Sequence, residues 1–171
     1  MLSSISHSIL DQLSELLSGL SSEEYSKQLA VFNGSSIGGH TRHVIEFYDC
    51  LIKGMYNGTV NYDERERDLA IQQNRDYAIH VIDHLKQKMM DQDVLAKKIH
   101  LKAQFGEHTM LIPTCWEREE AYLIEHSIHH FALIRIGVQE NFPTANITSD
   151  FGLAYSTIAY REQKTSQSQT N

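Results

Sequence analysis

The spacing of apolar residues along the chain predicts a mostly helical protein. In four stretches apolar side chains recur every three to four positions, which is the period of a helix with one buried face. Serines that can cap a helix precede the first two stretches, and Gly19 and the pair Asn57-Gly58 lie near their ends. The four predicted helices cover approximately residues 5–19, 37–55, 62–90 and 116–140. A short helical turn is expected between Ser21 and Leu29.

The period changes between residues 95 and 113. Apolar residues there alternate with polar ones, which is typical of a half-buried strand, and Gly106-Glu107 can turn the chain. This pattern predicts a small β-hairpin between the third and fourth helices. Thr114 is then expected to cap the fourth helix, with Glu117 in the position of a capping box.

Composition limits the class of protein. The 171 residues are enough for one domain, predicted at 1–163, and the polar segment 164–171 is predicted to be a disordered tail. The formal net charge is -7 and the basic residues are scattered, which argues against nucleic-acid binding. The first residues show no signal-peptide pattern and no apolar run could span a bilayer, so a cytoplasmic protein with no membrane partner is expected. Cys50 and Cys115 are too few for a disulfide framework.

Histidines on the fourth predicted helix form a candidate metal site. His126 and His130 are four residues apart, so they lie about 40° apart around a helix and one turn apart along it. Both imidazoles can therefore reach one ion, and a zinc-like site needs a third ligand from another buried face. The second predicted helix has a mostly apolar face that carries His40 and His43.

Another pair with the same spacing, His80 and His84, lies on the third predicted helix. The apolar stripe of that helix is centred about 160° from His80, so this pair is expected to face solvent and to have no function. Spacing alone also leaves open that the pair on the fourth helix is buried and only hydrogen-bonds its neighbours.

Three segments together resemble the DinB/YfiT-like family of metal-dependent enzymes. They are SIGGHTRHVIEFYDCL at 36–51, YDERERD at 62–68 and EHSIHHFALI at 125–134. The resemblance covers most of the chain. It implies an all-α fold, an up-down-down-up four-helix bundle, to which this chain adds the small hairpin between helices three and four. It also implies a divalent metal ion, zinc, nickel or iron, held by three histidines.

The resemblance assigns the metal ligands residue by residue. The single histidine of the family's second helix matches His43, and its paired histidines on the fourth helix match His126 and His130. His40 and His129 are extra histidines next to those positions. Each is expected to be either an outer partner of a ligand or an alternative ligand.

Two carboxylates lie close to the predicted ligands. Glu46 is one turn from His43, and Glu119 lies near the apolar stripe of the fourth helix. Each is a candidate catalytic residue that orients a ligand imidazole or accepts a proton. The alternative for both is an ordinary carboxylate with a salt-bridge partner.

Members of the resembled family include thiol-dependent S-transferases, so a small metal-dependent transferase or hydrolase is expected. Its substrate would be a small molecule, with a low-molecular-weight thiol as one candidate. Two other interpretations remain: a non-catalytic metal-binding or stress-related protein, and a metal-free protein whose site is vestigial and whose histidines satisfy one another.

A second apolar face on the fourth predicted helix predicts a homodimer. Ile124, Ile128 and Phe131 form this face, and a patch of that size is rarely left exposed on a monomer. The hairpin or the carboxy-terminal segment could cover it instead.

Overall fold

The computed structural model describes residues 2–89 and 98–168. Its elements in chain order are α1 (Leu2–Ser18), α2 (Ser22–Ser26), the 3-10 helix η1 (Ala30–Phe32), α3 (Ile37–Asn57), β1 (Thr59–Val60), α4 (Leu69–Gln73), α5 (Arg75–Met89), β2 (Lys98–Phe105), β3 (His108–Cys115), α6 (Trp116–Asn141) and α7 (Tyr155–Ser168).

The prediction of a simple four-helix bundle with one hairpin is wrong. The described residues form seven α-helices and a three-stranded mixed sheet in the order β1-β2-β3. β2 pairs antiparallel with β3, while β1, which directly follows α3, pairs in parallel with β2. The sheet therefore joins a segment next to α3 to the segment before α6. Local periodicity could not predict this pairing of β1 with β2.

Local capping explains two of the additional helices. Ser21 and Glu24 form a reciprocal capping box, which stabilises the start of the five-residue α2. The side chain of Asp68 accepts a hydrogen bond from the backbone of Ala70 and so begins α4. The third predicted helix is consequently divided: residues 62–68 are not helical, and α4 and α5 are separated at Asn74.

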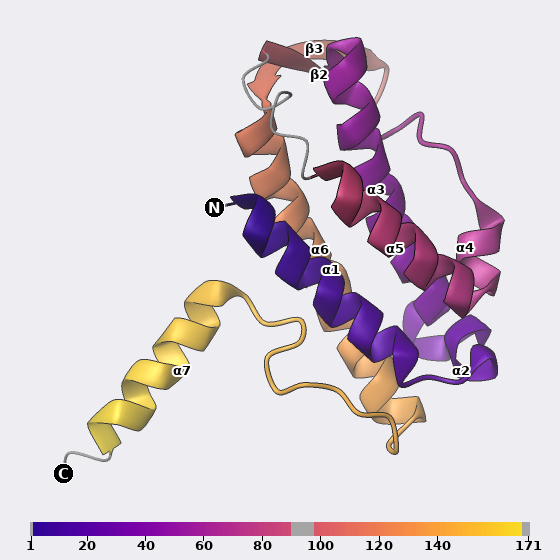
Figure 1. The fold of residues 1–171 in the computed structure, drawn as a ribbon, viewed down its shortest axis with the longest axis vertical. Helices are drawn as coiled ribbons and strands as arrows, with labels where there is room; N and C mark the ends of the chain where they lie inside the picture. Colours follow the sequence, from indigo (N-terminus) through magenta and orange to yellow (C-terminus); the bar gives the residue numbers. More distant parts are fainter. Residues whose placement is uncertain (1, 90–97, 169–171) are drawn as a thin grey trace.

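The carboxy-terminal prediction also needs correction. The segment 164–171 was predicted to be a disordered tail, but its first five residues belong to α7. Figure 1 shows α7 extending away from the other helices. Its last turns carry local bonds from hydroxyls to the backbone carbonyl four residues earlier, at Thr165 and Ser166. The rest of the predicted tail lies outside the described residues.

The long helices α1, α3, α5 and α6 lie side by side around the core, with the sheet at one end of α3 and α6 (Figure 1). Ser36 caps α3 through the backbone of Gly39, as predicted. The predicted cap of α6 is wrong: the N-cap residue is Cys115 without a side-chain bond, and the hydroxyl of Thr114 donates to Glu119 instead.

A close approach of backbones joins α3 to the sheet. A Cβ atom on Gly54 would lie 2.5 Å from Val60 Cγ2 and 2.9 Å from Val60 Cα. Gly58 ends α3 with a φ of 77°, in the left-handed region, and so turns the chain into β1. Glycine at these two positions lets β1 pack directly against the helix that it follows.

The apolar face of α6 that suggested a homodimer is covered within the chain. Ile124, Ile128 and Phe131 are all buried. The ring of Phe131 stacks on that of Phe151, with centroids 4.5 Å apart, so the segment after α6 covers part of this face. These residues therefore give no support to the predicted homodimer.

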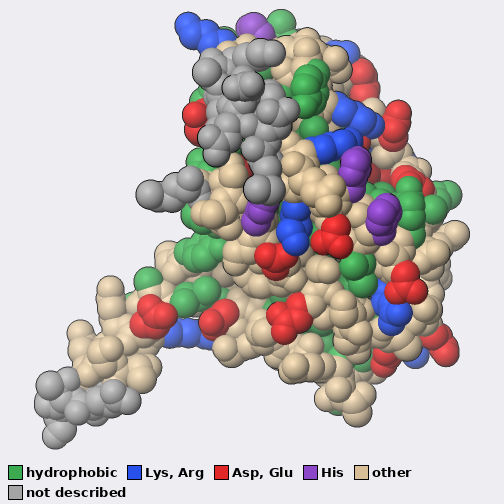
Figure 2. Space-filling view, viewed as in Figure 1, with side chains coloured by type: hydrophobic (Ala, Val, Ile, Leu, Met, Phe, Trp, Pro, Cys, Tyr) green, Lys and Arg blue, Asp and Glu red, His purple; other side chains and the backbone are tan. Residues whose placement is uncertain are grey.

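No helix of the described residues is long and apolar enough to cross a membrane. On the face of the molecule shown in Figure 2, acidic and basic side chains are interspersed, with no continuous basic patch.

Candidate metal centre

Three histidines from two helices converge on one point. His43 lies on α3, and His126 and His130 lie one turn apart on α6, which packs against α3. One ring nitrogen from each lies within 4.8 Å of those of the other two, and the ring centroids are 4.5–5.1 Å apart. The described residues thus contain a cluster that can hold a metal ion.

The distances within the cluster fit a shared ion. Nε2 of His43 lies 2.9 Å from Nε2 of His126. Two nitrogens bound at about 2.0–2.1 Å to one ion are about 2.9 Å apart at a right angle and about 3.3 Å apart at the tetrahedral angle. The same separation also suits a hydrogen bond between two neutral imidazoles. The geometry therefore accommodates either an ion or a shared proton.

The protonation state of the rings favours metal binding. Burial, with help from nearby Arg65 and neighbouring histidines, lowers the pKa of His43 to about 4. Burial and the other histidines lower the pKa of His130 to about 3, and burial also lowers the pKa of His126. The three rings are therefore neutral near pH 7, which is the form that coordinates a metal.

His40 is an outer partner of His130. Its Nδ1 lies 3.0 Å from Nδ1 of His130, and its ring packs edge-on against Phe32 with centroids 4.7 Å apart. If the Nδ1–H of His130 donates to His40, Nε2 of His130 keeps a lone pair for a metal. His40 then carries its own proton on Nε2, a buried atom with no hydrogen-bond partner. His129 is exposed and only meets the edge of the His130 ring.

Aromatic rings form a wall beside the histidines. The ring centroid of Phe47 lies 4.4 Å from that of His43 and 4.6 Å from that of His126. Tyr62 stacks on Phe47 at 4.8 Å, and Tyr122 stacks on His126 at 5.4 Å. This wall limits the access of water to one side of the site. Tyr62 was not predicted to lie at the site: residues 62–68 were expected to begin the third helix, but they are not helical and bring this ring next to Phe47.

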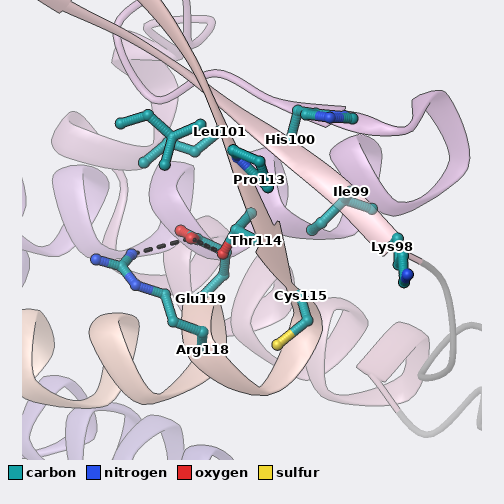
Figure 3. Close-up of a pocket in the computed structure, with 10 residues that line it drawn as sticks. Lys98, Ile99, His100, Leu101, Pro113, Thr114, Cys115, Arg118 and Glu119 are labelled. Atoms are coloured by element: carbon teal, nitrogen blue, oxygen red, sulfur yellow. Dashed lines mark hydrogen bonds and ion pairs between the residues drawn. The ribbon is translucent and has the colours of Figure 1, made fainter.

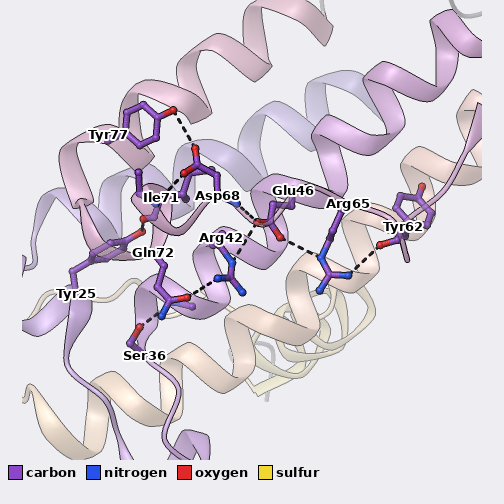
Figure 4. Close-up of polar contacts among 12 residues, drawn as sticks. Tyr25, Ser36, Arg42, Glu46, Tyr62, Arg65, Asp68, Ile71, Gln72 and Tyr77 are labelled. Carbon is purple, nitrogen blue, oxygen red and sulfur yellow. Dashed lines mark hydrogen bonds and ion pairs between the residues drawn. The ribbon is translucent and has the colours of Figure 1, made fainter.

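Glu46 is paired with two arginines and makes no hydrogen bond to a ligand histidine. Its carboxylate contacts Nε of Arg42 at 3.3 Å and Nε of Arg65 at 3.2 Å, and it accepts a bond from the backbone of Asp68 (Figure 4). Burial raises the pKa of the Glu46 carboxyl, and these neighbours offset part of that rise. The guanidinium of Arg65 lies over the ring of Phe47, 5.4 Å from its centroid. Glu46 thus holds a cation beside the histidines, and its ion pairs are those of the alternative interpretation, an ordinary carboxylate with salt-bridge partners.

Glu119 is fully buried and accepts three hydrogen bonds. Oε1 accepts from Thr114 at 2.7 Å and from Arg118 at 2.9 Å, and Oε2 accepts from the hydroxyl of Tyr62 at 2.9 Å. It lies two helical turns before His126, about 10 Å along the axis. Both glutamates therefore have salt-bridge partners, as expected if they are ordinary structural carboxylates. A catalytic role for either stays a prediction.

The second pair of histidines, His80 and His84, is exposed on α5, while Ala78, Ile82 and Leu85 on the same helix are buried. The spacing of four residues is therefore common to both pairs, and only the pair on α6 meets a third histidine among the described residues.

Comparisons with models of protein families, with curated proteins and with solved structures find no match to this chain.

Proposed function

We propose that this protein is a metal-dependent enzyme whose divalent ion is held by His43, His126 and His130. One observation carries the proposal: the three rings present nitrogens within 4.8 Å of one another from two packed helices. Their lowered pKa values add to it, because rings that stay neutral at pH 7 need not lose a proton before they bind an ion.

A site with three protein ligands suits catalysis better than a purely structural role, because it leaves at least one coordination position for water or substrate. Zinc, nickel and iron all accept imidazole ligands. A bound divalent ion would supply a Lewis acid that lowers the pKa of a coordinated water or thiol.

The remaining residues of the site orient the ligands and set the local charge. His40 fixes the tautomer of His130 through the 3.0 Å contact between their Nδ1 atoms. Arg65, fixed by Glu46 and by the backbone carbonyl of Tyr62, adds a positive charge next to the histidines. That charge favours an anionic reactant such as a thiolate, and the adjacent ring of Phe47 keeps water from one side.

We propose thiol-dependent S-transfer, or a related hydrolysis, as the reaction. We also propose that the chain belongs to the family of DinB/YfiT-like enzymes. Both rest on the three segments of sequence that resemble that family, together with the positive charge of Arg65 near the ligands.

A metal-free protein is the competing proposal, and one observation favours it. Two pairs of ring nitrogens, His43 with His126 and His40 with His130, lie at hydrogen-bonding distance from each other. The rings can thus satisfy one another without an ion.

Metal analysis separates the two proposals. The purified protein and the variants His43→Ala, His126→Ala and His130→Ala are dialysed against zinc, nickel or ferrous ions, and bound metal is measured by mass spectrometry. The double variant of His80 and His84 to alanine is a matched control, since that pair has the same spacing but is exposed. We expect one ion per chain in the wild type and the control, and a loss in each ligand variant. Equal metal content in all of them would refute the site.

A turnover assay separates an enzyme from a non-catalytic metal protein. The metal-loaded chain is incubated with an electrophile and glutathione, bacillithiol or coenzyme A, and the loss of free thiol is followed. We expect consumption that depends on His43, whereas stoichiometric metal binding without turnover of any thiol would favour the non-catalytic protein.

A further inference from the structure

A cleft lies between the hairpin of β2 and β3 and the first turns of α6 (Figure 3). Its volume is about 620 Å³, within the size range of small-molecule sites. Three of its lining residues form an aliphatic wall: Ile99, Leu101 and Ile112. The first is buried and the other two are half-buried, so part of this wall stays open to a ligand.

The register of the hairpin shows that the aliphatic wall faces α6. Directly paired residues of an antiparallel ladder project to the same face of the sheet. Leu101 pairs with Ile112. Ile99 pairs with Thr114, two positions further along each strand, and so shares that face. The hydroxyl of Thr114 donates to Glu119 on α6 at 2.7 Å, so this face of the hairpin is turned towards α6.

The polar groups on this face of the cleft satisfy one another. Oε1 of Glu119 accepts hydrogen bonds from Thr114 and Arg118. Its Oε2 accepts from the hydroxyl of Tyr62. Figure 3 shows Glu119 between Arg118 and Thr114. By the alternation along β2, Lys98 projects to the opposite face of the hairpin from the aliphatic wall. The wall therefore offers apolar contact next to a neutralised ion pair, which suits an uncharged group.

The cleft and the candidate metal centre lie along the same stripe of α6. Arg118, Tyr122 and His126 are spaced four residues apart, which places them one above another on a helix. Tyr122 connects the two sites: the guanidinium of Arg118 lies 5.5 Å from its ring centroid, and its ring stacks on that of His126 at 5.4 Å. Tyr122 is 37% exposed and His126 is half-buried, so this stripe is open to a ligand from outside. Eight residues of α-helix are about 12 Å long, and a ligand that occupies both sites is therefore an extended molecule.

We propose that the cleft holds the aliphatic tail of an uncharged substrate whose reactive head reaches the three histidines over Tyr122. The inference rests on the proposed function, because it makes this substrate the electrophile of the S-transfer. In that reaction the thiol loses its proton to solvent, its sulfur bonds to a carbon of the head, and the leaving group departs with the electron pair of the broken bond. Contact between the tail and the aliphatic wall removes apolar surface of both from water, which stabilises the complex.

Binding of the tail can be measured without catalysis. The metal-free protein is titrated in a calorimeter with butan-1-ol, hexan-1-ol and octan-1-ol, which are uncharged chains with no reactive group. We expect one site per chain, with an affinity that rises about two- to fourfold per added methylene, as the burial of each CH₂ group requires. No binding, or an equal affinity across the series, would overturn the proposal.

Two variants of one strand locate the tail. Ile112→Ser should weaken the binding of octan-1-ol at least fivefold, because it removes part of the aliphatic wall. Leu111→Ser is the matched control, since Leu111 is the neighbouring residue of β3, is 61% exposed and projects to the other face of the hairpin. It should bind as tightly as the wild type. Leu101→Ser repeats the test on β2 if Ile112→Ser does not fold. Equal affinity of the wall variant and Leu111→Ser would show that the tail does not bind in the cleft.

A paramagnetic ion tests the position of the head. The NMR line widths of octan-1-ol are compared between the Co²⁺-loaded and the Zn²⁺-loaded protein, a measurement that needs no turnover. We expect cobalt to broaden the protons next to the hydroxyl more than those of the terminal methyl, because the head lies nearer the histidines. Equal broadening of both ends, or none, would refute this orientation. Failure of the protein to bind Co²⁺ would instead refute the proposed function, since the calorimetric result for the cleft does not depend on a metal.

Discussion

Replacement of His40 by leucine tests how the site controls its own ligands. The change removes the group that accepts the Nδ1–H of His130 when Nε2 of His130 binds a metal. The affected N–H would lose its partner in a half-buried position. An unsatisfied buried donor costs about 1–3 kcal/mol, and loss of an outer partner weakens metal affinity roughly 10–100-fold. A 10–100-fold loss of affinity corresponds to about 1.4–2.8 kcal/mol. The cost of the unsatisfied N–H and the expected loss of metal affinity therefore agree in magnitude.

The assay is a titration of the metal-free protein with Co²⁺, in competition with a chelator and followed by visible absorption. His129→Leu is the matched control, because His129 neighbours His130 in the sequence but is exposed and offers it only a ring edge. His40→Asn should recover part of the affinity, since its amide oxygen can accept a hydrogen bond. If His40→Leu and His129→Leu bind Co²⁺ within twofold of the wild type, the assignment of His40 as an outer partner is wrong.

Three further predictions concern stability. Glu46→Gln should lower the free energy of unfolding by about 1–3 kcal/mol in urea, because two guanidinium groups lose a charged acceptor; an unchanged midpoint would contradict this. Gly54→Ala should also destabilise, by about 1–3 kcal/mol, since the added Cβ would meet Val60 at 2.5 Å and the strain exceeds the gain in helix propensity; a higher melting temperature would show that β1 can move. The metal-free protein should lose stability as the pH falls from about 6.5 towards 4, because the unfolded chain, with its ordinary histidine pKa values, takes up protons that His43 and His130 do not. The loss should be smaller in His43→Gln, and equal pH profiles for variant and wild type would exclude the histidines as its cause.

Periodicity predicted those parts of the fold that depend on one long apolar face. The helical segments around His43, and around His126 with His130, could be recognised because their buried positions recur every three to four residues over five or more turns. The exposed position of His80 could be predicted in the same way, from its angle to the buried stripe of its helix.

Features that depend on contacts between distant segments could not be predicted. β1 has two residues and is a strand only because it pairs with β2 about forty residues later. Arg65 lies in a charged segment that suits the first turn of a helix, but its partner is Glu46 on α3. For His40 the sequence left two roles open, an outer partner of a ligand or an alternative ligand. Spacing does not show that its Nδ1 contacts Nδ1 of His130.

The outer edge of the sheet shows how a single residue can limit self-association. Among the described strands β3 pairs only with β2, so the backbone groups on its other side point outward, next to the exposed side chains of Met110 and Leu111. His100 turns its N–H towards Gly58, so its partner across the ladder, Pro113, faces the open edge. Proline has no N–H to offer a foreign strand, and an incoming chain would lose one bond of the ladder there. The pyrrolidine ring of Pro113 thus interrupts the row of donors that a second chain would need in order to extend this sheet.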